Sequence, residues 1–78
     1  MKIDNPDLRA MFSGAGRCEF CRTWSSCLHC AHVMSRGAGW VDIPSNLVSL
    51  CFACHSSSHS GGYPTPDQLQ EIAARREG

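Results

Sequence analysis

Six cysteines and four histidines are the residues of this 78-residue chain best suited to metal binding, and all ten lie between residues 18 and 59. The cysteines form three pairs with two residues between partners, and two such pairs can converge on one tetrahedral zinc ion. In chain order the first, second and third pairs are Cys18/Cys21, Cys27/Cys30 and Cys51/Cys54. A chain of this length buries a small core, so a metal or disulfides usually stabilise the fold. No apolar signal segment is seen at the start, and paired cysteines in a cytosolic protein favour metal over disulfides.

Spacing decides which two cysteine pairs share the zinc. The first and third pairs are separated by 29 residues, enough for two strands and a loop. The first and second pairs are separated by five residues, which is cramped and takes Cys30 out of a predicted strand. The prediction is therefore a zinc site of the first and third pairs. Cys27 and Cys30 are then free thiols, with Cys30 as a small buried residue.

Two histidines, His55 and His59, lie four residues apart in a segment predicted to be helical, so their rings share one face. Neutral imidazoles in this arrangement often bind a divalent metal. Two surface histidines are the ordinary explanation of an isolated pair. Here the pair directly follows a cysteine pair, and His32 and Asn46 precede it, which favours the metal interpretation.

Short elements are predicted to position these residues. Alternation in a strand over 28–34 puts His29, Ala31 and Val33 on one face and His32 on the other. Proline at the first turn and polar caps predict one helix over 4–12 and another that begins after Thr65. The remaining predictions are a polar loop after the first cysteine pair, a loop over 35–45, a strand over 46–50 and a turn and short helix over 51–60. The apolar face of the last helix, which is expected to pack back on the domain, consists of Leu69, Ile72, Ala73 and Arg76.

In chain order these residues resemble the HNH, or ββα-metal, endonuclease pattern. That pattern runs CxxC, strand, His, glycine-containing loop, Asn-Leu-Val, CxxCH and His, and it covers residues 18–59 here. The resemblance implies a small α+β fold with a zinc-stapled, treble-clef-like core and flanking short helices. The expected organisation is an N-terminal helix and linker over 1–17, the HNH core over 18–62 and a C-terminal helix over 63–78.

The resemblance also implies a role for individual side chains. His32 matches the general base that takes a proton from the attacking water. Asn46 matches the asparagine that holds the loop and orients this base, and Arg36 is similar to a loop residue that faces phosphate. His55 and His59 match the helix positions that bind the catalytic metal or the phosphate. The first and third cysteine pairs match the structural zinc ligands.

One position departs from the pattern. Family members usually carry Asp or His just before the base, as a further metal ligand, and this chain has Ala31 there. Alanine cannot bind a metal, so His29 or water would have to supply that ligand.

These residue types suit phosphodiester hydrolysis. An imidazole can accept the proton of water at neutral pH, and a divalent cation polarises phosphoryl and leaving oxygens. We expect Mg²⁺, Mn²⁺, Ni²⁺ or Zn²⁺ in this role, with 5′-phosphate and 3′-hydroxyl products by the resemblance. The chain has no spare element for reading bases, so low sequence specificity is expected. Trp24 and Trp40 are expected in the core rather than stacked on nucleotides.

DNA is the expected partner, although seven basic and seven acidic residues give no net charge. Monomer and homodimer both stay open. Small solitary proteins of this family resemble phage products, so packaging or recombination partners are compatible, in the cytoplasm and without a membrane span. The main alternative is a non-catalytic zinc module that binds nucleic acid or protein and keeps the fold. A redox protein using Cys27 and Cys30 is a second alternative, but the βαβ context of such proteins is missing.

Overall fold

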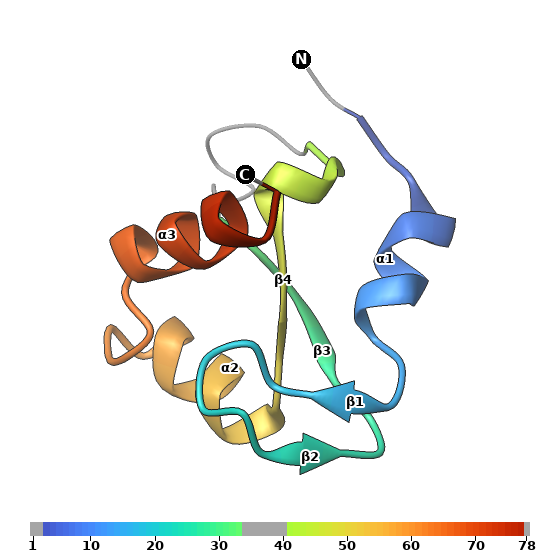
Figure 1. The fold of residues 1–78 in the computed structure, drawn as a ribbon. Coiled ribbons are helices and arrows are strands. Elements are labelled where there is room, and N and C mark those ends of the chain that lie inside the picture. Colours follow the sequence, from blue (N-terminus) through green and yellow to red (C-terminus); the bar gives the residue numbers. More distant parts are fainter. Residues whose placement is uncertain (1–2, 34–40, 78) are drawn as a thin grey trace.

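The computed structural model describes residues 3–33 and 41–77 and has a small α+β architecture there (Figure 1). There are two antiparallel sheets of two strands each, β1–β2 and β3–β4, and helices lie on both sides of β3–β4 (Figure 1). In chain order the described elements are α1 (Pro6–Phe12), β1 (Gly16–Arg17), β2 (Trp24–Ser25), β3 (His29–His32), the 3-10 helix η2 (Pro44–Asn46), β4 (Leu47–Leu50), α2 (Phe52–His59) and α3 (Pro66–Glu77). The order and type of the long elements agree with the sequence predictions.

Helix α1 begins as its sequence predicts. The Asn5 side chain accepts a hydrogen bond from the backbone N–H of Leu8 at 3.1 Å, and Pro6 stands in the first turn, where its missing N–H costs nothing. Met11, within this helix, is 79% exposed. The guanidinium of Arg76 lies over the Phe12 ring, 4.8 Å from its centre. Helix α1 thus meets the domain through Phe12, its cap residue Asn5 and the Arg9 side chain rather than through a broad apolar face.

The segment predicted as a polar loop contributes the strand β2 to a small hairpin, whose other strand, β1, precedes the first cysteine pair. Gly16 pairs with Ser25 and Arg17 with Trp24, and the first cysteine pair lies in the connection between the two strands. The prediction that Trp24 packs in the core is wrong, because its side chain is 62% exposed on this hairpin. Trp40 lies outside the described residues.

The second hairpin, β3–β4, carries the core on one face. Ala31 pairs with Val48, and both lie in the buried apolar cluster. The other face turns to α1, where the Ser49 hydroxyl donates to the carbonyl of Phe12 at 2.9 Å. Cys30 pairs with Ser49 and therefore shares this second face. Figure 1 shows α1 on one side of the hairpin and the helices α2 and α3 on the other.

Helix α3 covers the core as expected. Its start has the predicted reciprocal cap, in which the Thr65 hydroxyl accepts from the N–H of Gln68 at 3.2 Å and the Gln68 side chain accepts from the N–H of Thr65 at 2.8 Å. Its buried side chains join the cluster formed by the β3–β4 hairpin, and they are Leu69, Ile72 and Ala73. In the chain from 3 to 33 and from 41 to 77, no helix has the length and apolar character needed to cross a bilayer.

Candidate functional site

Four cysteines from two distant parts of the chain form one cluster. The Sγ atoms of Cys18, Cys21, Cys51 and Cys54 all lie within 4.8 Å of one another. The Cys21 and Cys51 Sγ atoms are 3.8 Å apart, and tetrahedral zinc with Zn–S bonds of about 2.3 Å requires sulfurs about 3.8 Å apart. The donor set and its dimensions therefore fit a structural zinc ion. They confirm the pairing of the first with the third cysteine pair.

Local backbone geometry shapes the first cysteine pair into a tight knuckle. The N–H of Arg22 donates to the carbonyl of Cys18 at 2.9 Å, and the N–H of Cys21 approaches the Cys18 sulfur at 3.5 Å. Arg22 closes the turn with a φ of 67°, in the left-handed region. Hydrogen bonds from Thr23 lower the pKa of Cys21 to about 6, which favours the thiolate that binds metal. Burial raises the pKa of Cys54, and a bound cation would favour its deprotonation.

The second cysteine pair takes no part in this cluster. Cys27 is exposed beside the β1–β2 hairpin, and Cys30 is half-buried on β3. Burial raises the pKa of Cys30 to about 11, with a further contribution from the negative charge of Asp42. The alternative zinc site built from the first and second pairs is therefore excluded.

Three histidines meet where α2 crosses the start of β3. The Nε2 atoms of His55 and His59 are 3.1 Å apart, and the His29 ring centre lies 5.2 Å from that of His55. Nitrogens that share one metal at about 2.0–2.1 Å are separated by roughly 3.0–3.4 Å, so the helical pair has the spacing of a two-nitrogen metal site. Burial, then the charges of His59 and His29, lower the pKa of His55, which favours its neutral, metal-binding form. In the described ranges, the cysteines form the only set of three or more ligands gathered within 4.8 Å, so His29 is a neighbour of this pair rather than part of an equally tight group.

His32 lies on the opposite face of β3 from His29, as strand alternation requires. Its Nε2 atom is 2.7 Å from Oδ1 of Asp42, whose side chain is fully buried. The second oxygen of Asp42 accepts from the backbone N–H of Asn5 at 2.8 Å and from the Arg9 guanidinium. A buried carboxylate thus joins the end of β3 to the start of α1.

Asn46 connects the two chain segments on either side of residues 34–40. Its side-chain amide donates to the carbonyl of Val41 at 2.8 Å, and its own carbonyl accepts from the N–H of Val33 at 2.9 Å. Asn46 is 6% exposed, so these bonds form away from water. They fix the position of Val41 and hence of the neighbouring Asp42.

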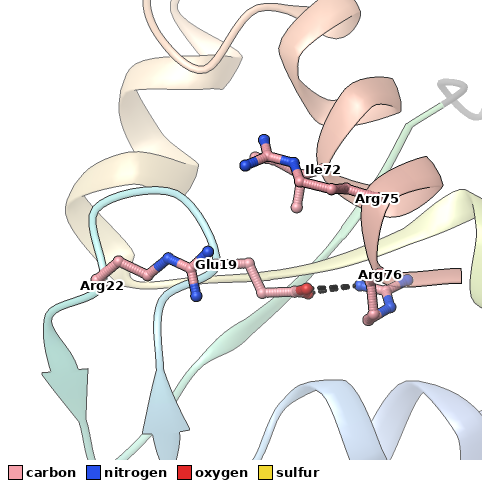
Figure 2. Close-up of a pocket in the computed structure, with 5 residues that line it drawn as sticks. All are labelled: Glu19, Arg22, Ile72, Arg75 and Arg76. Carbon is pink, nitrogen blue, oxygen red and sulfur yellow. Dashed lines mark hydrogen bonds and ion pairs between the residues drawn. The ribbon is translucent and has the colours of Figure 1, made fainter. Parts of the chain in front are cut away.

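A surface hollow of about 250 Å³ lies between the first cysteine pair and α3. Figure 2 shows the arginine side chains at this hollow, from the knuckle and from α3, with the ion pair of Arg76 to Glu19 beside them. The Arg76 guanidinium binds both carboxylate oxygens of Glu19, at 2.7 and 2.8 Å. This ion pair offsets the charge of Glu19, and Arg22 and Arg75 also line the hollow, although Glu71 lies 3.6 Å from the Arg75 guanidinium.

A family model described as HNH endonuclease matches residues 16–61, which is 46 of the 78 residues. The chain belongs to the HNH endonuclease family. No curated protein and no solved structure matches it. The HNH segment contains both halves of the cysteine cluster, the β3–β4 hairpin and α2. HNH family members are usually nucleases, so a nuclease-type function is supported in general terms.

Within the HNH segment the predicted site residues fall into two groups. His55 and His59 stand together on α2, while His32 and Asn46 lie at the opposite end of the β3–β4 hairpin. Arg36 lies outside the described residues. The catalytic roles of these side chains remain predictions.

Sequence reasoning missed Asp42 as part of the site. The signal available was weak: it is one of two acidic residues between 18 and 59, and it stands between the apolar Val41 and Ile43. Apolar neighbours indicate that a segment is buried. An acidic residue among them is therefore a candidate buried carboxylate.

Proposed function

We propose that this HNH protein is a DNA endonuclease that hydrolyses phosphodiester bonds with low sequence specificity. The observation that carries the proposal is the family match over a segment in which the pattern histidines are present and two of them, His55 and His59, have metal-binding spacing. In this proposal His32 is the general base. Asn46 holds in place the chain segment that lies next to His32. A divalent cation at the helical pair would polarise the phosphoryl oxygens and stabilise the leaving oxygen.

The arrangement of the two groups about β3 suits this division of roles. The resemblance puts a metal ligand and the base at successive strand positions, and successive strand residues face opposite ways. Here Ala31 faces the α2 and α3 side and is 5% exposed, and His32 faces the α1 side. His29, two residues before Ala31 on the same face, is the nearest side chain to replace the missing ligand.

DNA is the proposed substrate because the chain offers arginines for phosphate and few groups for reading bases. Arg22 and Arg75 line the hollow beside the zinc knuckle, where they would contact a strand that runs past the catalytic residues. A cytoplasmic location and phage packaging or recombination partners belong to the same proposal and rest on the resemblance alone.

The test is cleavage of supercoiled plasmid by zinc-loaded protein with magnesium, manganese, nickel or chelator. We expect metal-dependent nicking that falls at least about 10²-fold in His32→Ala, because a general base contributes at least that much. Zinc content should be unchanged, since His32 is remote from the cysteine cluster. Undiminished cleavage by the zinc-loaded variant would contradict the assignment of the base.

A second candidate is a zinc-stapled module that binds nucleic acid without cutting it. Burial of Ala31 in the apolar core favours this candidate, because the usual ligand position then offers no donor. It predicts a gel shift of plasmid DNA, weakened by salt, without cleavage in any metal. The same assay therefore decides between the two candidates.

A further inference from the structure

Asp42 is a buried carboxylate in contact with the proposed general base, His32. Its side chain is 0% exposed, and among the described residues its oxygens face donors from His32, Asn5 and Arg9. Burying a charge is costly unless it is paired and hydrogen-bonded, and this set supplies both.

The backbone beside Asp42 is held from two directions. Its N–H donates to the carbonyl of Ile3 at 2.8 Å, and the Asn46 side chain holds the carbonyl of Val41. Both the main chain and the carboxylate are therefore fixed in place. A group fixed in this way can impose its geometry on a neighbouring ring.

The contact between Asp42 and His32 determines the ring's tautomer. An ionised carboxylate can only accept hydrogen bonds, so Nε2 of His32, 2.7 Å from Oδ1, must carry a proton. A neutral imidazole protonated at Nε2 has its basic lone pair at Nδ1. The carboxylate thus determines which ring nitrogen is able to accept a further proton.

We propose that Asp42 is the positioning residue of His32: it fixes the ring and its Nε2–H tautomer, so that Nδ1 takes the proton of the attacking water. This inference rests on the proposed nuclease function. In the reaction, one O–H bond of water breaks and its proton passes to Nδ1, while the oxygen forms a bond to phosphorus. The P–O3′ bond breaks, and the leaving 3′ oxygen takes a proton from solvent. Asp42 itself does not change its protonation state.

Replacing Asp42 by asparagine should reverse the tautomer. Oδ2 faces the Asn5 N–H and the Arg9 guanidinium, so we expect the amide oxygen of the variant to take that side. Its NH₂ group then points at His32, and Nε2 must become an acceptor. The ring proton then moves to Nδ1. This nitrogen can then no longer accept the proton of water.

The experiment compares zinc-loaded wild type, Asp42→Asn and the matched control Asp4→Asn. Asp4 also binds the Arg9 guanidinium, but its side chain is 57% exposed. Long-range ¹H–¹⁵N correlation spectra at neutral pH report the tautomer of His32, and plasmid cleavage reports kcat and KM. We expect Nε2–H in wild type and Asp4→Asn, and Nδ1–H in Asp42→Asn. The kcat of Asp42→Asn should fall at least about 10²-fold, with KM changed less than about threefold.

The outcomes separate the two proposals. An Nδ1–H tautomer in the wild type would overturn the positioning role, and this measurement does not depend on the variant folding. A folded, zinc-loaded Asp42→Asn with wild-type kcat would overturn it as well. A wild type that holds Nε2–H and loses it in Asp42→Asn, yet cuts no DNA, would support the tautomer assignment and overturn the nuclease function.

Discussion

At the scale of single residues, the two cysteines outside the zinc cluster have different surroundings. Cys27 is exposed, and its backbone N–H donates to the Ser25 hydroxyl at 3.2 Å. Cys30 is half-buried on β3, and burial followed by the charge of Asp42 raises its pKa to about 11, against an opposing effect of Arg9. A raised pKa keeps the thiol protonated at neutral pH, and the protonated form is a poor nucleophile.

We therefore predict that alkylation separates these two thiols. In zinc-loaded protein at pH 7.5, iodoacetamide should label Cys27 at least about tenfold faster than Cys30, as measured by peptide mass spectrometry. Labelling of Cys30 should accelerate as the pH rises toward 11, because the thiolate fraction grows only near the raised pKa. Equal rates in the folded protein would contradict the burial of Cys30, and urea-unfolded protein serves as the control in which the difference disappears.

At the scale of elements, one arginine joins α3 to the rest of the domain. Arg76 binds the Glu19 carboxylate near the zinc knuckle and the carbonyls of Pro44 and Leu47 in η2 and β4. Its guanidinium also lies over the ring of Phe12 in α1. The side chain is 26% exposed, so solvent screens these charged hydrogen bonds only in part.

Adjacent arginines on α3 give a matched comparison. Arg76→Ala should lower the free energy of unfolding by about 2 kcal/mol, because charged hydrogen bonds contribute about 1.5–3 kcal/mol each and partial exposure reduces their sum. Arg75 is 64% exposed and its Glu71 partner is 3.6 Å away. Arg75→Ala should therefore change the free energy of unfolding by less than about 0.5 kcal/mol. Urea titration followed by circular dichroism measures the free energy of unfolding of both variants. A loss in Arg75→Ala as large as that in Arg76→Ala would show that helix propensity, and not the contacts of Arg76, stabilises this end of α3.

At the scale of the whole molecule, the features that the sequence predicted are those encoded by the spacing of a few residues or by local caps. Cysteine and histidine spacings predicted the zinc pairing and the helical pair, and local caps predicted the starts of α1 and α3. The β1–β2 hairpin was missed because strands of two residues carry no periodic signal. Asp42 was missed because its partners His32, Arg9 and Asn5 are 10, 33 and 37 residues away in the chain. Only the folded structure brings these groups together.

The cysteine cluster ties together the two parts of the molecule that carry the candidate site. Cys18 and Cys21 stand between β1 and β2, Cys51 and Cys54 stand where β4 joins α2, and Cys18 is itself 0% exposed in the core. Structural zinc contributes about 10–16 kcal/mol in small domains, whereas a core of this size rarely contributes more than about 3–5 kcal/mol. We therefore predict that the folded state depends on zinc bound at this cluster more than on apolar burial.

Removing zinc should accordingly unfold the whole domain in one step. We expect chelation by excess EDTA to abolish near-ultraviolet circular dichroism and to reduce the helical signal, with both changes following the loss of zinc measured by mass spectrometry. Cys21→Ser should reproduce this state, and Cys27→Ser, a substitution of the same kind outside the cluster, should bind zinc and fold like the wild type. A metal-free protein that keeps its near-ultraviolet signal would show that the core alone holds the fold.

If the metal is essential, any loss of cleavage on chelation reports unfolding as well as removal of a catalytic cation. Only protein with zinc retained at the cysteines can then show which metal the histidines require.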